Sequence, residues 1–135
     1  VLVMQTFLPY DDFSLAAKCL DRQRLGCQRK EARQILDILD GKYTAWKEHP
    51  AVVMWRGYEN ALIEYRNHIL YEWESRGYKN ILSKYIEPGP IILPKWFEDE
   101  RVFSSHRAAL LFKDYKWYSR FEWVEEPVLN YFWPV

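Results

Sequence analysis

The fold is decided by residues 11–41, which read DDFSLAAKCLDRQRLGCQRKEARQILDILDG. The polar residues Asp11, Asp12 and Ser14 are types that cap the beginning of a helix, and the final Asp-Gly pair is a typical helix end. Between them, apolar side chains recur every three or four residues, as in a helix that faces a core. These apolar residues are Ala16, Leu20, Cys27, Ala32, Ile35, Leu36 and Leu39. The stretch predicts a long amphipathic helix through Leu39, with a bend at Gly26.

Residues 42–49 are expected to link this helix to a second long one. Pro50 suits a first helical turn, and the helical pattern runs to about Ser75, with Gly77 as its stop. The aromatic residues of this segment are so numerous that more than one face must be covered, as in the central element of a small bundle. Gly57 lies inside the segment, where glycine costs about 1 kcal/mol relative to alanine, so it indicates close approach of another backbone or a ligand.

The two ends of the chain differ from this helical centre. The segment from Val1 to Pro9 is short and apolar and predicts an extended arm that lies on the body. Ser104 or Ser105 is expected to cap a third helix through about Lys113, and the remainder is an aromatic tail. Together these segments predict an all-α fold, a compact bundle of three main helices with an extended N-terminal arm and an aromatic C-terminal tail.

The composition limits the class of protein. A chain of 135 residues is long enough for one core, so we expect residues 1–135 to form a single domain. Aromatic residues make up 18% of the chain, and so many rings indicate that some of them line a groove, a pocket or a partner face. The 19 basic and 19 acidic residues cancel, which excludes a protein that grips nucleic acid by net charge alone.

The remaining composition excludes several other classes. Cys19 and Cys27 are too few for a disulfide scaffold and lack the spacing of a zinc site, so reduced, buried thiols are expected. No stretch approaches the roughly 18 apolar residues of a membrane span, and the beginning of the chain lacks the plan of a signal peptide. We therefore expect a soluble protein, located in the cytoplasm or with the nucleoid. The three histidines have no close spacing and there is no glycine-rich phosphate loop, so neither a metal nor a cofactor is expected.

A line of polar residues on the first helix is the strongest functional signal. At positions i, i+3, i+7 and i+10 stand Asp21, Arg24, Gln28 and Glu31, which places them on one helix face. Further positive charge flanks the line at Arg22, Arg29 and Lys30. Such a line is often a solvated face with intrahelical ion pairs. A carboxylate among arginines is also what a site needs to hold phosphates while it stabilises a cationic sugar or imine, and this interpretation is the one we favour.

Three further segments are candidates for contact with nucleic acid. Arg56 and Tyr58 are expected to reach a phosphate and to stack on a base. His106 and Arg107 follow the two serines that are expected to begin the third helix, which predicts either an anion site or a simple cap. In the tail, aromatic and basic residues alternate.

Lys116 and Trp117 belong to this alternating stretch of the tail, and such a mixture of basic and aromatic residues is typical of a surface that binds an unstacked base. Alternatively, the same residues pack the tail over the core, and the sequence favours neither interpretation over the other.

At this point the motifs resemble a known family, the phage-type pyrimidine-dimer DNA glycosylases with abasic-site lyase activity, also called endonuclease V of the dimer-excision type. The resemblance runs through most of the chain. It is carried by Met4–Tyr10, by Leu20–Leu25 with Gln28-Arg29, by Pro50–Tyr58, by Arg76-Gly77-Tyr78 and by the aromatic tail. It implies a compact three-helix body with the N-terminal arm between helices.

The resemblance also implies a mechanism. In that family an N-terminal α-amine attacks the sugar C1′ to form an imine, a glutamate on the first helix assists, and arginines hold a kinked, base-flipped duplex. In an ungapped comparison the reactive amine falls at Gln5, the glutamate at Gly26 and an arginine at Arg29. Glu31 or Asp21, on the polar line, is then expected to supply the carboxylate from a shifted position. Because four residues precede Gln5, the amine is expected to be that of Val1 or of a processed start near Met4, folded back into the site.

The resulting hypothesis is a DNA glycosylase, with or without abasic-site lyase activity, that acts on damaged or modified pyrimidines in duplex DNA. No obligate protein partner is expected. Two alternatives stay open: a noncatalytic nucleic-acid binding module of the same fold, and a glycosidic-bond enzyme that acts on a free nucleotide.

Overall fold

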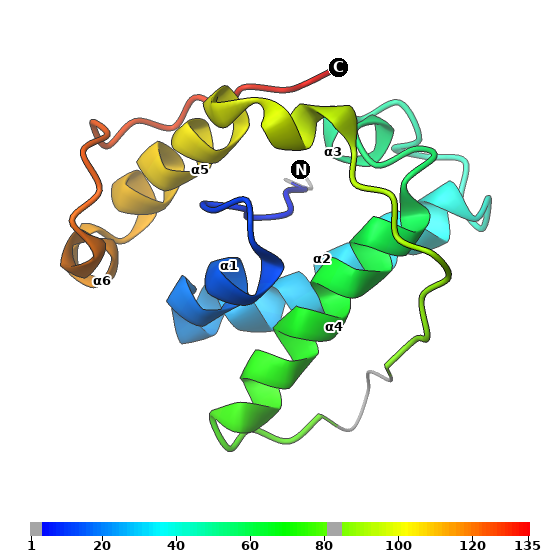
Figure 1. Ribbon diagram of the computed structural model, residues 1–135, viewed down its shortest axis with the longest axis horizontal. Helices are drawn as coiled ribbons and strands as arrows, with labels where there is room; N and C mark the ends of the chain where they lie inside the picture. Colours follow the sequence, from blue (N-terminus) through cyan, green and yellow to red (C-terminus); the bar gives the residue numbers. More distant parts are fainter. Residues whose placement is uncertain (1–3, 81–84) are drawn as a thin grey trace.

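The computed structural model describes residues 4–80 and 85–135 (Figure 1), and within these ranges the chain forms helices and no strand. Val1 to Val3, the first part of the expected arm, lie outside the described residues. The longer helices are α1 (Phe13–Cys19), α2 (Arg22–Leu39), α4 (Glu59–Ser75) and α5 (Glu100–Lys113). Four short ones are α3 (Pro50–Val53), α6 (Tyr115–Tyr118) and the 3₁₀ turns η1 (Lys95–Glu98) and η2 (Ser119–Phe121). The predicted all-α class is confirmed.

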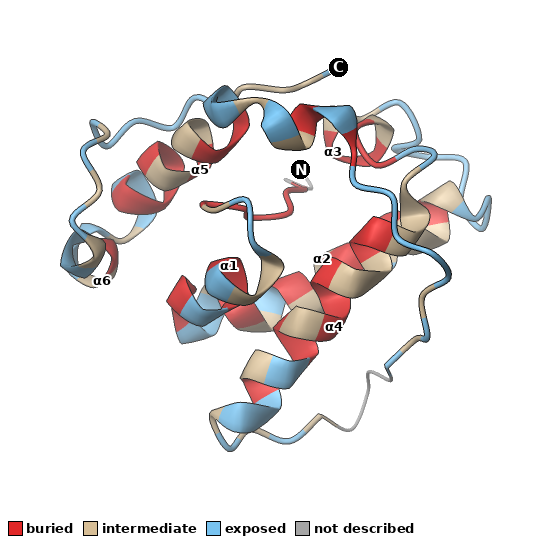
Figure 2. Cartoon of the chain, in the orientation of Figure 1, coloured by how far each residue is buried: buried red, intermediate tan, exposed pale blue. Residues whose placement is uncertain are grey.

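The three longest helices build the body. Helices α2 and α4 pack along one another, and α1 packs on α4. The N-terminal arm lies between these helices and α5 (Figure 1). Their buried faces turn toward each other and toward the arm, as Figure 2 shows, so one core includes side chains from every layer. Among the described residues no helix is both long and apolar enough to cross a membrane.

The expected first helix is two helices. The backbone at Leu20 (ψ 138°) and Asp21 (ψ 164°) is extended, so α1 ends before the polar line begins and α2 starts at Arg22. The bend expected at Gly26 is therefore wrong, because Gly26 lies within α2. A Cβ atom at Gly26 would come within 3.2 Å of the Trp73 ring of α4, so this glycine allows two helices to approach closely. Cys27 was expected to be buried and is exposed.

The expected second helix is also interrupted. Helix α3 ends at Val53, and a turn that contains Gly57 at φ +87° precedes α4. A Cβ atom at Gly57 would meet no atom within 4 Å, so the expected close approach of another backbone is wrong. Glycine is present because L side chains rarely adopt a positive φ.

The third helix begins earlier than its serines indicate. Asp99 accepts a hydrogen bond from the backbone N–H of Arg101 and caps α5, so Ser104 and Ser105 lie one turn inside the helix. The Ser104 hydroxyl donates to Glu125, and the Ser105 hydroxyl donates to the carbonyl oxygen of Val102. The anion site expected at a helix beginning near Ser104 is therefore wrong.

The described part of the arm is extended, as expected, and it is buried rather than laid on the surface. Met4 and Leu8 are fully buried, and the residues between them are nearly so (Figure 2). An extended segment in a helical core has no neighbouring strand to pair its backbone, and unpaired buried amides are costly. Side chains of the surrounding helices must therefore supply the hydrogen bonds.

The turn before α4 gives a first prediction. Replacing Gly57 with alanine should lower the free energy of unfolding by about 1 kcal/mol, because the left-handed backbone is strained with a Cβ atom. Asparagine tolerates this conformation, so Gly57→Asn should cost at most about half as much. Urea denaturation of the two variants measures the difference. If the larger asparagine costs more than alanine, crowding rather than backbone conformation explains the glycine.

Candidate active site

A small hollow lies where the arm meets α2, α5 and the C-terminal tail. Its volume is about 190 Å³. It is lined by Gln5 and Phe7 of the arm, by Gln23, Arg24, Cys27 and Glu31 of α2, by Lys113 at the end of α5 and by Tyr131 of the tail. We call it the Glu31 hollow. Glu31, Arg24 and Gln5 were candidates from the sequence, and the structure brings these three together.

Gln28 lies beneath this hollow and fixes the arm to α2. Its side-chain amide donates to the carbonyl oxygen of Gln5 at 2.8 Å and to the carboxylate of Glu31 at 3.0 Å. Its side-chain oxygen accepts from the backbone N–H of Phe7 at 3.2 Å and from the Tyr65 hydroxyl at 2.7 Å. The two donors and the two lone pairs of the amide are thus all used. Gln28 is fully buried, so in this structure it orients the arm and Glu31.

Other side chains form hydrogen bonds with further groups of the arm. The Trp55 indole donates to the Thr6 hydroxyl at 3.0 Å, and the backbone N–H of Leu8 donates to Nδ1 of His106 at 2.9 Å. Burial lowers the pKa of His106 to about 3, so the imidazole stays neutral and keeps its acceptor nitrogen. His106 has no exposed surface, and this placement does not favour the DNA contact expected of it.

Glu31 has the electrostatics of a proton-transfer group. Burial raises its pKa to about 7, and three partners counteract part of that rise. They are the backbone N–H of Gln5, which hydrogen-bonds the carboxylate, the positive charge of Lys113 and the side-chain amide of Gln28. A carboxyl with a pKa near 7 can both accept and donate a proton near neutral pH. Burial also raises the pKa of Tyr131 to about 12, so its hydroxyl keeps its proton.

Asp21, the other candidate carboxylate, points to a different partner. Its carboxylate accepts a hydrogen bond from the Tyr118 hydroxyl, and its backbone N–H donates to the same hydroxyl at 3.0 Å. Arg24 donates to the second carboxylate oxygen of Asp21 at 3.2 Å. Asp21 therefore orients Arg24 at the edge of the Glu31 hollow and ties α6 to the beginning of α2.

The cations of α2 line two larger hollows beside the first. One, of about 450 Å³, is lined by Arg22, Gly26, Arg29, Lys30 and Trp73 and shares Gln23 and Cys27 with the Glu31 hollow. The other, of about 530 Å³, continues past Arg29 and Lys30 to Arg33, Tyr43 and Trp46. We call the two together the cationic groove.

Aromatic rings hold the arginines of this groove in place. The guanidinium of Arg29 lies 4.1 Å from the centre of the Trp73 ring, and that of Arg22 lies 5.1 Å from the centre of the Tyr78 ring. The structure thus groups Arg22, Arg29 and Lys30 beside the Glu31 hollow, as the sequence pattern indicated.

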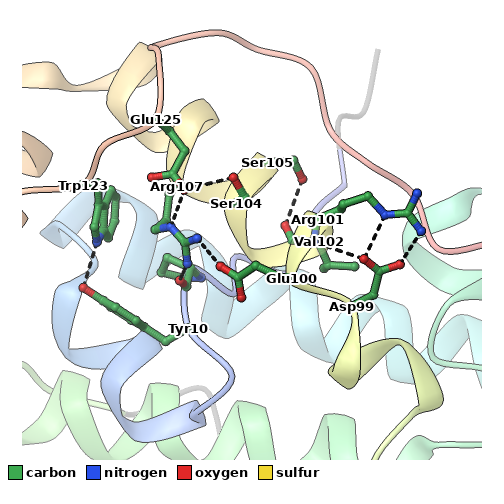
Figure 3. A network of polar contacts seen from close by, with 11 residues as sticks. Tyr10, Asp99, Glu100, Arg101, Val102, Ser104, Ser105, Arg107, Trp123 and Glu125 are labelled. Carbon is green, nitrogen blue, oxygen red and sulfur yellow. Dashed lines mark hydrogen bonds and ion pairs between the residues drawn. The ribbon is translucent and has the colours of Figure 1, made fainter.

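The other residues expected to contact DNA do not line the Glu31 hollow or the cationic groove. Arg56 donates to the carbonyl oxygen of Lys47 at 2.6 Å, and Tyr58 lines a separate hollow with Pro90. Arg107 is bonded to the arm and the tail (Figure 3). The Trp117 indole donates to the carbonyl oxygen of Cys19 at 2.8 Å, and its neighbour Lys116 is exposed.

Five residues of the Glu31 hollow were not among the site residues predicted from the sequence: Phe7, Gln23, Cys27, Lys113 and Tyr131. Lys113 and Tyr131 are about 80 and 100 positions from Glu31, so no periodicity connects them to it. Within the described residues, no group of three or more His, Cys, Asp or Glu side chains is placed to hold a metal ion.

Comparison with known proteins identifies the family. The family model described as pyrimidine dimer DNA glycosylase matches residues 4–85, which is more than half of the chain. The chain belongs to this family, and the resemblance seen in the sequence is confirmed. Its general role is that of a pyrimidine dimer DNA glycosylase, with DNA as the substrate. No curated protein and no solved structure matches the chain.

The raised pKa of Glu31 gives a second prediction. Below about pH 4.5 the carboxyl is protonated in both the folded and the unfolded chain, whereas between pH 4.5 and 7 the folded chain holds the proton more tightly. The stability that this proton contributes is lost as the pH rises through 7. Glu31→Gln, which cannot ionise, should therefore become more stable than the original chain at pH 8.5, by roughly 1 to 2 kcal/mol after solvent screening.

Chemical denaturation of both proteins between pH 4.5 and 8.5 measures this effect. A stability difference that stays constant across the range would contradict a raised pKa at Glu31.

Proposed function

We propose that this protein excises damaged pyrimidines from duplex DNA and then cleaves the abasic strand through an imine, with the Glu31 hollow as its active centre. The observation that carries the proposal is that the side-chain amide of Gln28 bonds both the carbonyl oxygen of Gln5, at 2.8 Å, and the carboxylate of Glu31, at 3.0 Å, which holds the backbone of Gln5 next to Glu31. Gln5 is also the position at which the family resemblance places the reactive amine. A chain that began at Gln5 would therefore present its α-amine to the carboxyl of Glu31.

The chemistry that such a pair supports is nucleophilic substitution at the sugar. The amine lone pair forms a bond to C1′, the bond from C1′ to the base breaks, and the base leaves with the electron pair and takes up a proton. Opening of the sugar ring gives a protonated imine. Removal of a proton from C2′ then expels the 3′ phosphate. Glu31 can stabilise the cation as a carboxylate and can move these protons.

The cationic groove is the proposed phosphate-binding surface. Arg22, Arg29 and Lys30 lie next to the Glu31 hollow, so phosphates held there would place a neighbouring nucleotide at Glu31. Because the net charge of the chain is zero, the attraction of DNA must come from this local surface. Binding is then expected to weaken as salt concentration rises.

The third prediction tests the amine directly. A fusion protein cleaved so that the chain begins at Gln5 should form a covalent adduct with an abasic duplex under borohydride. The same chain starting at Val1 should form none, because Gln5 then has no free amine. The released protein must be used fresh, since a terminal glutamine can cyclise. Peptide mapping of the adduct distinguishes the Gln5 amine from the side-chain amine of Lys113, which lines the same hollow.

Matched variants separate catalysis from binding. In the chain that begins at Gln5, Glu31→Gln should lower the rate of strand cleavage by at least about 100-fold while duplex affinity is retained. Glu87→Gln, at an exposed position away from the hollow, is the control and should leave the rate unchanged. Duplex binding without any adduct in either chain would favour the noncatalytic module, and hydrolysis of a mononucleotide alone would favour the third hypothesis.

A further inference from the structure

The C-terminal tail returns across the molecule to the proposed active centre. From the end of η2 it runs back along α5 toward α3 (Figure 1). The guanidinium of Arg101 lies 4.2 Å from the centre of the Phe132 ring, and the Trp133 ring packs edge-on against His49. Tyr131 reaches the arm, with its ring 6.4 Å from that of Phe7 and 5.7 Å from that of His106, measured between centres.

Tyr131 contributes an unused hydrogen-bonding group to the Glu31 hollow. Its side chain lines the hollow, and its hydroxyl is buried without a hydrogen-bond partner among the described residues. The side-chain nitrogen of Gln5, in the same hollow, is also buried without a partner there. A buried polar group left unpaired costs about 1–3 kcal/mol, so two such groups at one small hollow indicate that a polar ligand completes them.

One arginine holds both the tail and the arm in this arrangement. Arg107 donates to the carbonyl oxygen of Pro9 at 2.7 Å, to the carboxylate of Glu125 at 2.9 Å and to Glu100 (Figure 3). The Ser104 hydroxyl donates to the same Glu125 oxygen at 2.9 Å. Because Pro9 is in the arm and Glu125 precedes Tyr131 by six residues, this clamp ties the arm to the tail beside the hollow that both line.

The size of the hollow limits its occupant. A volume of about 190 Å³ corresponds to about six water molecules, and it lies below the roughly 300 Å³ at which pockets for drug-sized ligands begin. A single sugar is small enough for such a space, and a base attached to it would lie outside the hollow. An abasic deoxyribose within a strand has a C1′ hydroxyl and a ring oxygen, and both oxygens can accept hydrogen bonds from the Tyr131 hydroxyl and the Gln5 side-chain amide.

We propose that Tyr131 is a substrate-contacting residue whose hydroxyl bonds the abasic deoxyribose in the Glu31 hollow, and that Glu125, held by Arg107, is a positioning residue for it. This inference rests on the proposed function. It concerns residues 107–131, which lie outside the stretch that the family model matches.

The experiment uses the form of the chain that cleaves abasic duplex. Tyr131→Phe keeps the ring that packs on Phe7 and His106 and removes only the hydroxyl. The value of kcat/KM on abasic duplex should fall about five- to tenfold, the effect of one lost hydrogen bond. The Tm should stay the same or rise, because the hydroxyl has no partner in the free protein. Tyr115→Phe, at an exposed position of α6, is the control for both measurements.

A double-mutant cycle tests the positioning role of Glu125. Glu125→Gln weakens the ion pair to Arg107 and should lower kcat/KM severalfold when Tyr131 is present. In the Tyr131→Phe background it should have almost no further effect, because it acts through the lost hydroxyl. A merely structural role of Glu125 would lower kcat/KM equally in both backgrounds, and that result would overturn the positioning proposal.

The proposed activity and the role of Tyr131 can be overturned separately. A chain that neither cleaves nor traps abasic duplex in either form would overturn the proposed function and, with it, this inference. An active chain in which Tyr131→Phe matches the original kcat/KM, or loses Tm instead, would overturn the inference alone.

Discussion

The structure depends on how a buried, extended segment obtains its hydrogen bonds. Gln28 supplies two of them, to the carbonyl oxygen of Gln5 and from the backbone N–H of Phe7, and the same amide group also bonds to Tyr65 and Glu31. The arm could not stay between the helices with its amides unpaired, because the surrounding core offers no water to replace these contacts. The same amide sets the position of the Glu31 carboxyl, so the packing of the arm and the chemistry of the site share one constraint.

Much of the fold could be predicted because it follows from local signals. The apolar repeat through Leu39 and the proline at position 50 are properties of short segments, and the corresponding helix ends were confirmed. The helix ends that were predicted wrongly lie where two short-range sequence signals conflict. Leu20 continues the apolar repeat although its backbone is extended, and Asp99 caps α5 while the serines that looked like caps bond elsewhere.

The candidate site could be predicted only on its α2 side. Helical spacing placed Glu31 and Arg24 on one face, and the structure puts both at one hollow. The other walls come from segments whose approach depends on tertiary packing, and so nothing in the sequence placed Lys113 and Tyr131 beside Glu31. Charge patterns were least informative for Arg107, whose guanidinium holds the arm and the tail rather than facing solvent. A pattern of residue types shows what a side chain can bond, and the fold decides what it does bond.

The most direct test of this account is amide hydrogen exchange along the arm, followed residue by residue. The backbone N–H of Phe7 donates to Gln28 and that of Leu8 donates to His106, with both donors buried in the core. The account predicts that these two amides exchange as slowly as those of Leu62 and Ile69 in α4. Exchange as fast as in the exposed loop of residues 42–47 would show that the arm is not locked between the helices, and would contradict the central claim.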